Sequence, residues 1–347
     1  MEKERAMILQ MVADGKITAT QGVELLKALE ESERPKSRAS QDTGQRSHSR
    51  PSIDLPDDLG TTIGNLVESI IGNFGFGFGN GYKFEETFEG SFTPGDESCN
   101  IDFSTLNGRI AVEAWDRSDY AVKLIKNIRG GSEHEARRKA DEMVRVKREP
   151  SALSIKMQKG PSLMGGMAII AYLPKERVYN MELQTANGRV ELRGLDTREI
   201  KARTANGLVK LEDVNAEKVD ASTSNGKVLL RTSASDVRAQ SSNGRIVVVP
   251  LGTAGGDARY ELATSNGSVR MQCSAEPDTG FLLDLHTSNG KIETEMPDLE
   301  YELNEKHHGR RSVKAKTRGF DSMSNRIRIQ ARTSNGKIVV GSPVDWE

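Results

Sequence analysis

Hydrophobic and polar residues alternate along most of the chain from about residue 85 onward. Around the middle of the chain, Ile200, Ala202 and Thr204 occupy one set of positions, and Glu199, Lys201 and Arg203 occupy the other. A period of two with one apolar face is typical of strands that cover a core on one side. The same phase returns in the following segments, at Val219, Ala221, Thr223, Val228 and Leu230, and at Val237, Ala239, Ser241, Ile246 and Val248.

An Asn-Gly pair interrupts this alternation at regular intervals. From Asn187 the spacings are 19, 19, 18, 23, 23 and 46 residues, and Thr or Ser stands two residues before each of these asparagines. Fixed periods of this length indicate stacked supersecondary units. The repeated asparagines are Asn107, Asn187, Asn206, Asn225, Asn243, Asn266, Asn289 and Asn335.

Asn-Gly is also a strong signal for two-residue hairpins, so an antiparallel meander is the first alternative. A meander needs a turn every 8–12 residues, which is twice as often as Asn-Gly occurs here. The sequence therefore predicts a mainly β protein built around a parallel β-solenoid. The absence of a hexapeptide period favours a right-handed β-helix, with a β-prism or an irregular β-roll as alternatives.

The asparagines are expected to form a structural ladder. If equal positions stack from coil to coil, each Asn side chain points inward, is buried and bonds to the Asn of the next coil. Gly is expected to supply the positive φ that such a corner needs. We expect the 46-residue interval to contain a further coil at Val313, Ala315 and Thr317.

Other segments follow helical or irregular patterns. We expect a helical hairpin over 1–31, a flexible linker over 32–54, an amphipathic helix or cap over 55–84 and the solenoid over 85–347. Ser132 and Glu135 form a capping box that begins a short helix over 132–146, laid against the solenoid. Acidic residues and a lack of base-reading side chains make the first segment a poor match to a DNA-binding helix-turn-helix.

Composition narrows the classes of function. Lys and Arg number 49 against 50 Asp and Glu, and this balance argues against a nucleic-acid partner. Cys99 and Cys273 have neither metal-site nor disulfide spacing, and both are expected to be small buried hydrophobes. No secretory signal or membrane span is recognisable, so the cytoplasm is the expected location, with peripheral membrane attachment or a non-classical export route left open.

Catalytic and cofactor motifs are missing from the sequence. The five histidines have no metal spacing with Cys or acidic residues, and no Walker loop or nucleophile-base pair is present. Outward strand positions mix charges of both signs, as on an ordinary solvated face. We therefore expect no enzyme activity, no cofactor and no metal.

Two regions together resemble a known family. Residues 14–29 look like the short SHOCT-like helical hairpin, and the repeats, with Asn107-Gly108-Arg109-Ile110 leading to Trp115-Asp116, look like the "putative adhesin" β-solenoid domain. The combination is similar to the YvlB/LiaX-like proteins of Firmicutes. This resemblance implies a role in cell-envelope stress and supplies no catalytic residues.

The sequence thus predicts a non-enzymatic binding or scaffold protein. The alternatives are a polysaccharide-active β-helix enzyme and a filament-forming solenoid. A protein partner or self-association through the hairpin is expected, and membrane contact stays open. Lys306, His307, His308, Arg310 and Arg311 form a basic loop that is either a solvated edge or a site for an anion. The candidate partner-binding residues are Leu25, Leu26, Leu29, Lys306, Arg310 and Arg311.

Overall fold

The structure is a computed structural model that describes residues 81–93, 98–129, 131–158, 165–252, 256–273, 278–307, 309–341, 343–344 and 346. All of them belong to the second of two compact units, residues 76–347. The hairpin expected over 1–31, with Leu25, Leu26 and Leu29, lies outside the described residues, as do the linker and most of the 55–84 segment. Within the part described, no helix is both long enough and apolar enough to span a membrane.

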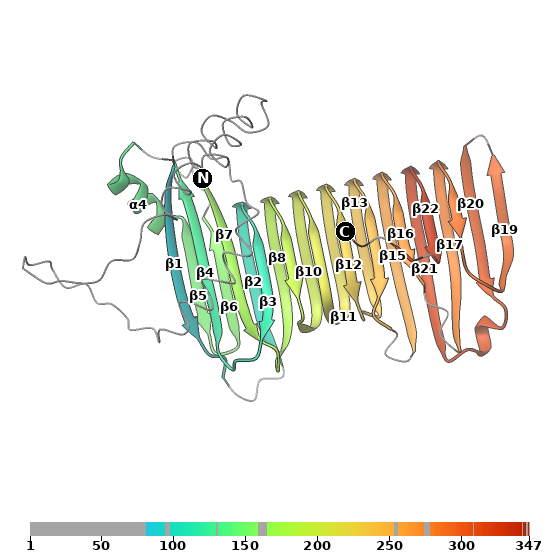
Figure 1. The fold of residues 1–347 in the computed structure, drawn as a ribbon, viewed down its shortest axis with the longest axis horizontal. Helices are drawn as coiled ribbons and strands as arrows, with labels where there is room; N and C mark the ends of the chain where they lie inside the picture. The colour runs from blue at the N-terminus through green and yellow to red at the C-terminus, as the bar shows by residue number, and fades with distance from the viewer. Residues whose placement is uncertain are drawn as a thin grey trace, which may run out of the picture. The chain divides into compact units, whose positions relative to one another are not determined.

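The described chain forms two long β-sheets that face each other across a narrow core (Figure 1). In a typical coil, the strand before Asn-Gly belongs to sheet B and the strand after it belongs to sheet A. Neighbouring coils stack in parallel and in register, so that Val219 pairs with Val237 and Ala221 with Ala239. The predicted mainly β, mostly parallel architecture is confirmed.

Both sheets have a defined spatial order of strands. Sheet B contains, in this order, β5 (Val144–Glu149), β6 (Ala152–Met157), β2 (Cys99–Asn107), β8 (Val178–Asn187), β10 (Asp196–Asn206), the second half of β11 (Val209–Asn225), β13 (Asp236–Asn243), β15 (Asp257–Asn266), β21 (Asn325–Asn335), β17 (Thr279–Asn289), β20 (Arg310–Thr317) and β19 (Leu299–His307). Sheet A contains, in this order, β1 (Tyr82–Gly90), β4 (Tyr120–Ile128), β7 (Gly165–Pro174), β3 (Ile110–Trp115), β9 (Val190–Arg193), the first half of β11, β12 (Val228–Thr232), β14 (Ile246–Pro250), β16 (Val269–Gln272), β22 (Ile338–Gly341) and β18 (Ile292–Thr294).

The core follows the predicted alternation. Ile200, Ala202, Val209 and Leu211 are fully buried, whereas Lys201 and its alternating neighbours face solvent. Small and β-branched side chains suit the interior because the two sheets lie close together. A low content of aromatic residues is therefore compatible with a continuous core.

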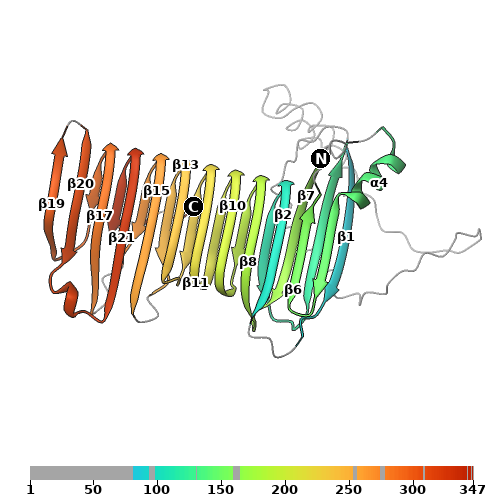
Figure 2. The same cartoon turned by 180° about the vertical axis from the view of Figure 1, so that it is seen from behind.

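The order of coils in space differs from their order in sequence. The coil formed by β21 and β22 lies between the coil of β15 and β16 and the coil of β17 and β18 (Figure 2). The coil expected at Val313, Ala315 and Thr317 is wrong, because these residues lie in β20, which runs antiparallel to β17 and forms a hairpin with β19. After this hairpin the chain turns through a short 3-10 helix, η1 (Phe320–Ser322), and inserts its last coil one place back.

Antiparallel strands and one helix close the ends of the stack. At the N-terminal end, helix α4 (Glu133–Glu142) packs on β1, β4 and β5 through Ala136 and Ala140. Its N-cap, Ser132, accepts a bond from the Glu135 backbone N–H at 3.3 Å, as predicted. The helix ends before residue 146, because Val144 already begins β5. At the C-terminal end, the Thr294 and Tyr301 hydroxyls are hydrogen-bonded at 2.8 Å and link the last strand of each sheet.

Candidate functional site

The Asn-Gly corners carry a polar ladder on the surface of the stack. The side-chain amide nitrogen of Asn225 donates to the side-chain oxygen Oδ1 of Asn206 at 2.9 Å, and that of Asn243 donates to Oδ1 of Asn225 at 2.8 Å. These side chains are exposed, so the expected inward, buried position is wrong. The chain bends out of sheet B at this residue, and strand alternation no longer fixes the direction of its side chain. The spatial order of the ladder is Asn107, Asn187, Asn206, Asn225, Asn243, Asn266, Asn335 and Asn289.

The buried polar residue of each corner is the Thr or Ser two positions before Asn. The Thr223 hydroxyl donates to the Gly207 carbonyl oxygen of the adjacent coil at 3.2 Å, and Ser241 repeats this contact with Gly226. The corner glycines are needed chiefly for space. A Cβ on Gly226 would overlap the Gly207 carbonyl oxygen. The expected positive φ is found at Gly108, Gly188, Gly207 and Gly336, with values of 153–159°, but not at Gly226. The repeat therefore has an architectural role.

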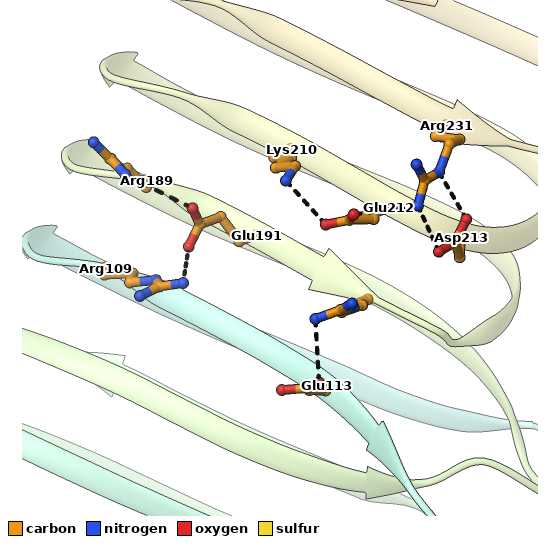
Figure 3. Close-up of polar contacts among 9 residues, drawn as sticks. Arg109, Glu113, Arg189, Glu191, Lys210, Glu212, Asp213 and Arg231 are labelled. Carbon is orange, nitrogen blue, oxygen red and sulfur yellow. Dashed lines mark hydrogen bonds and ion pairs between the residues drawn. The ribbon is translucent and has the colours of Figure 1, made fainter. Parts of the chain in front are cut away.

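The outer face of sheet A carries a band of paired charges that crosses several coils (Figure 3). Glu191 lies between Arg109 and Arg189, and Arg193 reaches Glu113 at 3.9 Å. Burial lowers the pKa of Arg109, and the facing Glu191 carboxylate acts against this shift. The pairing fixes long side chains in place across neighbouring strands.

The band continues toward the middle of the stack. Arg231 bonds Asp213 at 2.7 Å and Glu212 at 3.2 Å, while Lys210 bonds Glu212 at 2.9 Å. The hydrogen bond from Arg231 holds the pKa of Asp213 below its ordinary value. The whole band thus presents fixed charges of both signs.

Both tryptophans of the chain lie on this face. Trp115 stacks on Tyr172 with ring centroids 5.5 Å apart, and the Arg117 guanidinium lies 4.6 Å from the Trp115 ring centroid. Burial raises the pKa of Tyr172 to about 12. This aromatic pair stands at one end of the charged band.

Trp346 stands at the other end. Arg231 lies 5.4 Å and Lys210 5.9 Å from its ring centroid. The Val344 backbone N–H donates to the Gln272 side chain at 3.5 Å, so Val344 lies over the outer face of sheet A at β16, and Trp346 lies over it near β11 and β12. Outward-facing Val247, on the strand between these contacts, is fully buried.

Sheet B has a shallow hollow of about 420 Å³ on its outer face, near the N-terminal end. Its floor contains the small side chains of Ala152 and Ser154 on β6. Long charged side chains surround the floor, and Lys156 is paired with Asp102. The remaining charged lining residues are Arg145, Lys147 and Glu149 on the edge strand β5.

The structure places the basic loop at the tip of the β19–β20 hairpin. Lys306 lies directly opposite Arg311, which is half-buried, and Arg310 is exposed beside Gly309. These residues are far along the strand order from both tryptophan clusters. The basic residues proposed for partner binding therefore lie apart from the two tryptophans on sheet A.

Metal-ligating side chains and thiols are the remaining candidates for chemistry among the described residues. Among them, no group of His, Cys, Asp and Glu is arranged to hold a metal ion. Cys99 is buried as predicted, whereas Cys273 is half-buried, and burial raises the pKa of the Cys273 thiol to about 12. A thiol with so high a pKa is a poor nucleophile at neutral pH.

Two features of these surfaces were missed at the level of sequence. Trp115 and Tyr172 are 57 positions apart, and only the pairing of β3 with β7 brings them together. The signal for the hollow was weak: Ala152 and Ser154 are small residues at outward strand positions.

Comparison with known proteins identifies the fold family. The model of the family described as Toastrack DUF4097 matches residues 99–340, and that of a SHOCT-like domain matches residues 3–34. The search of curated proteins finds no match.

Several solved structures are similar over most of the repeat region. A "putative cell adhesion protein" from Clostridium sporogenes is 11% identical, with 76% of this chain and 100% of that chain covered and a TM-score of 0.36. A "putative adhesin" from Bacteroides fragilis is 14% identical, with 74% and 97% covered and a TM-score of 0.39. A "putative lipid binding protein" from Parabacteroides distasonis is 10% identical, with 77% and 96% covered and a TM-score of 0.25.

Proposed function

The chain belongs to the Toastrack DUF4097 family, and from this premise we propose that it is a non-enzymatic protein-binding scaffold of the bacterial cell-envelope stress response. The envelope role rests on the resemblance to YvlB/LiaX-like proteins, which combine the same two kinds of domain. The SHOCT-like segment at 3–34 would supply a second point of contact for partners.

The observation that carries the binding role is the composition of the outer face of sheet A. Trp, Tyr and Arg are the residues most enriched among the energetic centres of protein interfaces. Here both tryptophans lie on one face, each with an arginine near its ring, and Tyr172 stacks on the first. A flat sheet with rigid aromatic anchors suits a protein partner better than a small molecule.

The charges between the anchors support specificity. Paired Arg and Glu side chains have little freedom left to lose when a partner binds. An opposing surface must match the sequence of positive and negative positions from Arg189 to Asp213. The same pairing weighs against the alternative of a polysaccharide-active enzyme, because Glu191, Glu212 and Asp213 are each engaged by a cation.

A site-specific crosslinking experiment tests this proposal. A photoreactive residue would replace Arg193, whose side chain is 62% exposed between the two anchors, in the full-length protein. A matched control would carry the same residue at Lys201, which lies on the outer face of sheet B. We expect a crosslinked protein partner from position 193 in cells under envelope stress, and a large loss of that product when Trp115→Ala is added. Equal products from both positions, or a yield that Trp115→Ala does not change in a folded variant, would refute the proposal.

A further inference from the structure

We propose that copies of this protein associate head to tail through the two edges of sheet B. Strand β19 of one copy would add to strand β5 of the next and continue the sheet from copy to copy. The partner is a second copy of the chain, and the surface is distinct from the outer face of sheet A. The contact is heterologous, so it would produce an open linear assembly.

The two edge strands lie at opposite ends of the same sheet (Figure 1). Among described strands, β5 pairs with β6 alone and β19 pairs with β20 alone. Each therefore leaves one side of its backbone N–H and C=O groups without a strand partner. Such edges are templates for strand addition.

The strand directions fit an antiparallel junction. Strand β5 runs opposite to β6, which is parallel to the coil strands, whereas β19 has the same direction as β17. When one copy is displaced along the stack without rotation, β19 of the first copy and β5 of the second run in opposite directions. Sheet B would then continue with the antiparallel pairing that already exists at both of its ends.

The edges carry opposite charge. Strand β5 carries three basic residues, Arg145, Lys147 and Arg148, and one acidic residue, Glu149. Strand β19 carries three acidic residues, Glu300, Glu302 and Glu305, and the basic residue Lys306. Unlike edges therefore attract, whereas two β5 edges or two β19 edges would repel. This difference makes the contact directional, because it disfavours the symmetric pairings.

Several of these charges are available for a new contact. Within the described part of the chain, Arg145, Lys147 and Glu305 form no ion pair. Arg145 and Lys147 project from the outer face of β5 beside the hollow, and Glu305 projects from the outer face of β19, opposite Ser312. In an antiparallel junction these side chains would lie on the same face of the continuous sheet.

The two ends of the stack also have complementary steps. At the C-terminal end, sheet B extends by β20 and β19 beyond its last coil, whereas sheet A stops at β18. At the N-terminal end, sheet A extends by β4 and β1, sheet B adds β5 alone, and helix α4 packs on β1, β4 and β5 beside the junction. Joining β19 to β5 brings β18 toward β1 with a space of about one strand, ~4.8 Å, left between them. The longer layer of each end thus meets the shorter layer of the other.

Sedimentation velocity of the full-length protein over a hundredfold range of concentration tests the association. We expect larger species to grow with concentration and to shrink at high salt, because screening weakens exposed charge pairs. Arg145→Glu/Lys147→Glu and Glu302→Lys/Glu305→Lys should each raise the concentration needed for assembly about tenfold or more. A charge-matched control away from both edges, Lys227→Glu/Arg238→Glu, should assemble like the wild type.

Mixing the two reversed variants separates this mechanism from misfolding. Each variant alone brings like charges together at the junction, but in the mixture the acidic β5 of one meets the basic β19 of the other. Assembly should therefore return on mixing. A protein that stays monomeric throughout the range, or reversed variants that assemble as well alone as mixed, would overturn the proposal. The crosslink expected at position 193 does not depend on either result.

Discussion

The Thr223 hydroxyl, buried in the core, donates to the Gly207 carbonyl oxygen of the neighbouring coil at 3.2 Å. The equivalent bond recurs at Thr185, Thr204, Ser241, Thr264, Thr333 and Thr287. The Thr223 donor is buried and its acceptor, Gly207, is half-buried, and each bond links one coil to the next. The exposed Asn ladder runs beside it.

This relationship predicts unequal costs for two neighbouring substitutions. Thr223→Val keeps the shape of the side chain but leaves the Gly207 carbonyl without its partner, and should lower the free energy of unfolding by about 1–3 kcal/mol. Asn225→Ala removes two side-chain hydrogen bonds, to Asn206 and from Asn243, but both are exposed, so it should cost less, within about 1 kcal/mol. Urea denaturation of both variants, with exposed Lys227→Gln as the control, measures the difference. A larger loss of unfolding free energy from Asn225→Ala would contradict this, because the exposed Asn ladder would then contribute more to the contact between coils than the buried Thr bond.

Gly226 should tolerate no side chain. An added Cβ would overlap the Gly207 carbonyl oxygen, which is backbone and can move only if the coils separate. Gly226→Ala should therefore lower the unfolding free energy by several kcal/mol or prevent folding, beyond the usual range of about 0.5–3 kcal/mol. Gly131→Ala is the matched control, since its nearest neighbour would be the flexible Glu135 side chain at 3.6 Å. Comparable thermal unfolding of the two variants would contradict the close stacking at the corner.

Lys126 and Glu86 form an ion pair in which one side chain is buried and the other is exposed. The Lys126 ammonium bonds the Glu86 carboxylate at 2.7 Å, and the lysine side chain is 4% exposed whereas the glutamate is 50% exposed. Glu86→Gln leaves a buried cation without its counter-charge and should cost about 1–3 kcal/mol, while Lys126→Met should cost less. Glu142→Gln, which breaks the exposed pair with Arg138 on α4, is the control. Chemical denaturation in which Lys126→Met proves the more harmful variant would refute this order.

Tyr179 should make stability depend on pH in the alkaline range. Its hydroxyl donates to the Pro174 carbonyl at 2.7 Å, and burial raises its pKa well above the ordinary value of about 10. A raised folded-state pKa contributes stability that is complete below pH 10 and is lost as pH rises above it. Tyr179→Phe should be less stable than the wild type at pH 9 but lose less between pH 9 and pH 11. Parallel losses in urea midpoints would contradict this assignment.

The sequence predicted those features that depend on local pattern. Alternation identified the inward set from Ile200 to Leu211, and the Ser132 cap identified a helix. The alternation wrongly predicted an inward side chain for Asn225, because side chains at a corner no longer follow the period of two. The surface at Trp115 and Tyr172 could not be foreseen, since it depends on which strands become neighbours.

The order of the coils could not be predicted for a related reason. The coils with an Asn-Gly corner share one pattern, Thr or Ser two residues before Asn-Gly, so the corner does not specify which coil stacks on which. The 46-residue interval was compatible with a hidden coil, and only the antiparallel pairing of β20 with β17 excludes it.

Engineered disulfides test this order most directly, and with it the stacking on which the candidate surfaces depend. Ser265 on β15 lies beside Ser334 on β21, between the paired positions Thr264–Thr333 and Asn266–Asn335, and both are exposed. A sequential stack would instead place Ser265 beside Ser288. Adjacent parallel strands are about 4.8 Å apart, within disulfide range, whereas positions two strands apart are not. On oxidation, Ser265→Cys/Ser334→Cys should form an intramolecular disulfide, and Ser265→Cys/Ser288→Cys should stay reduced. A disulfide in the second variant and none in the first would contradict the structure.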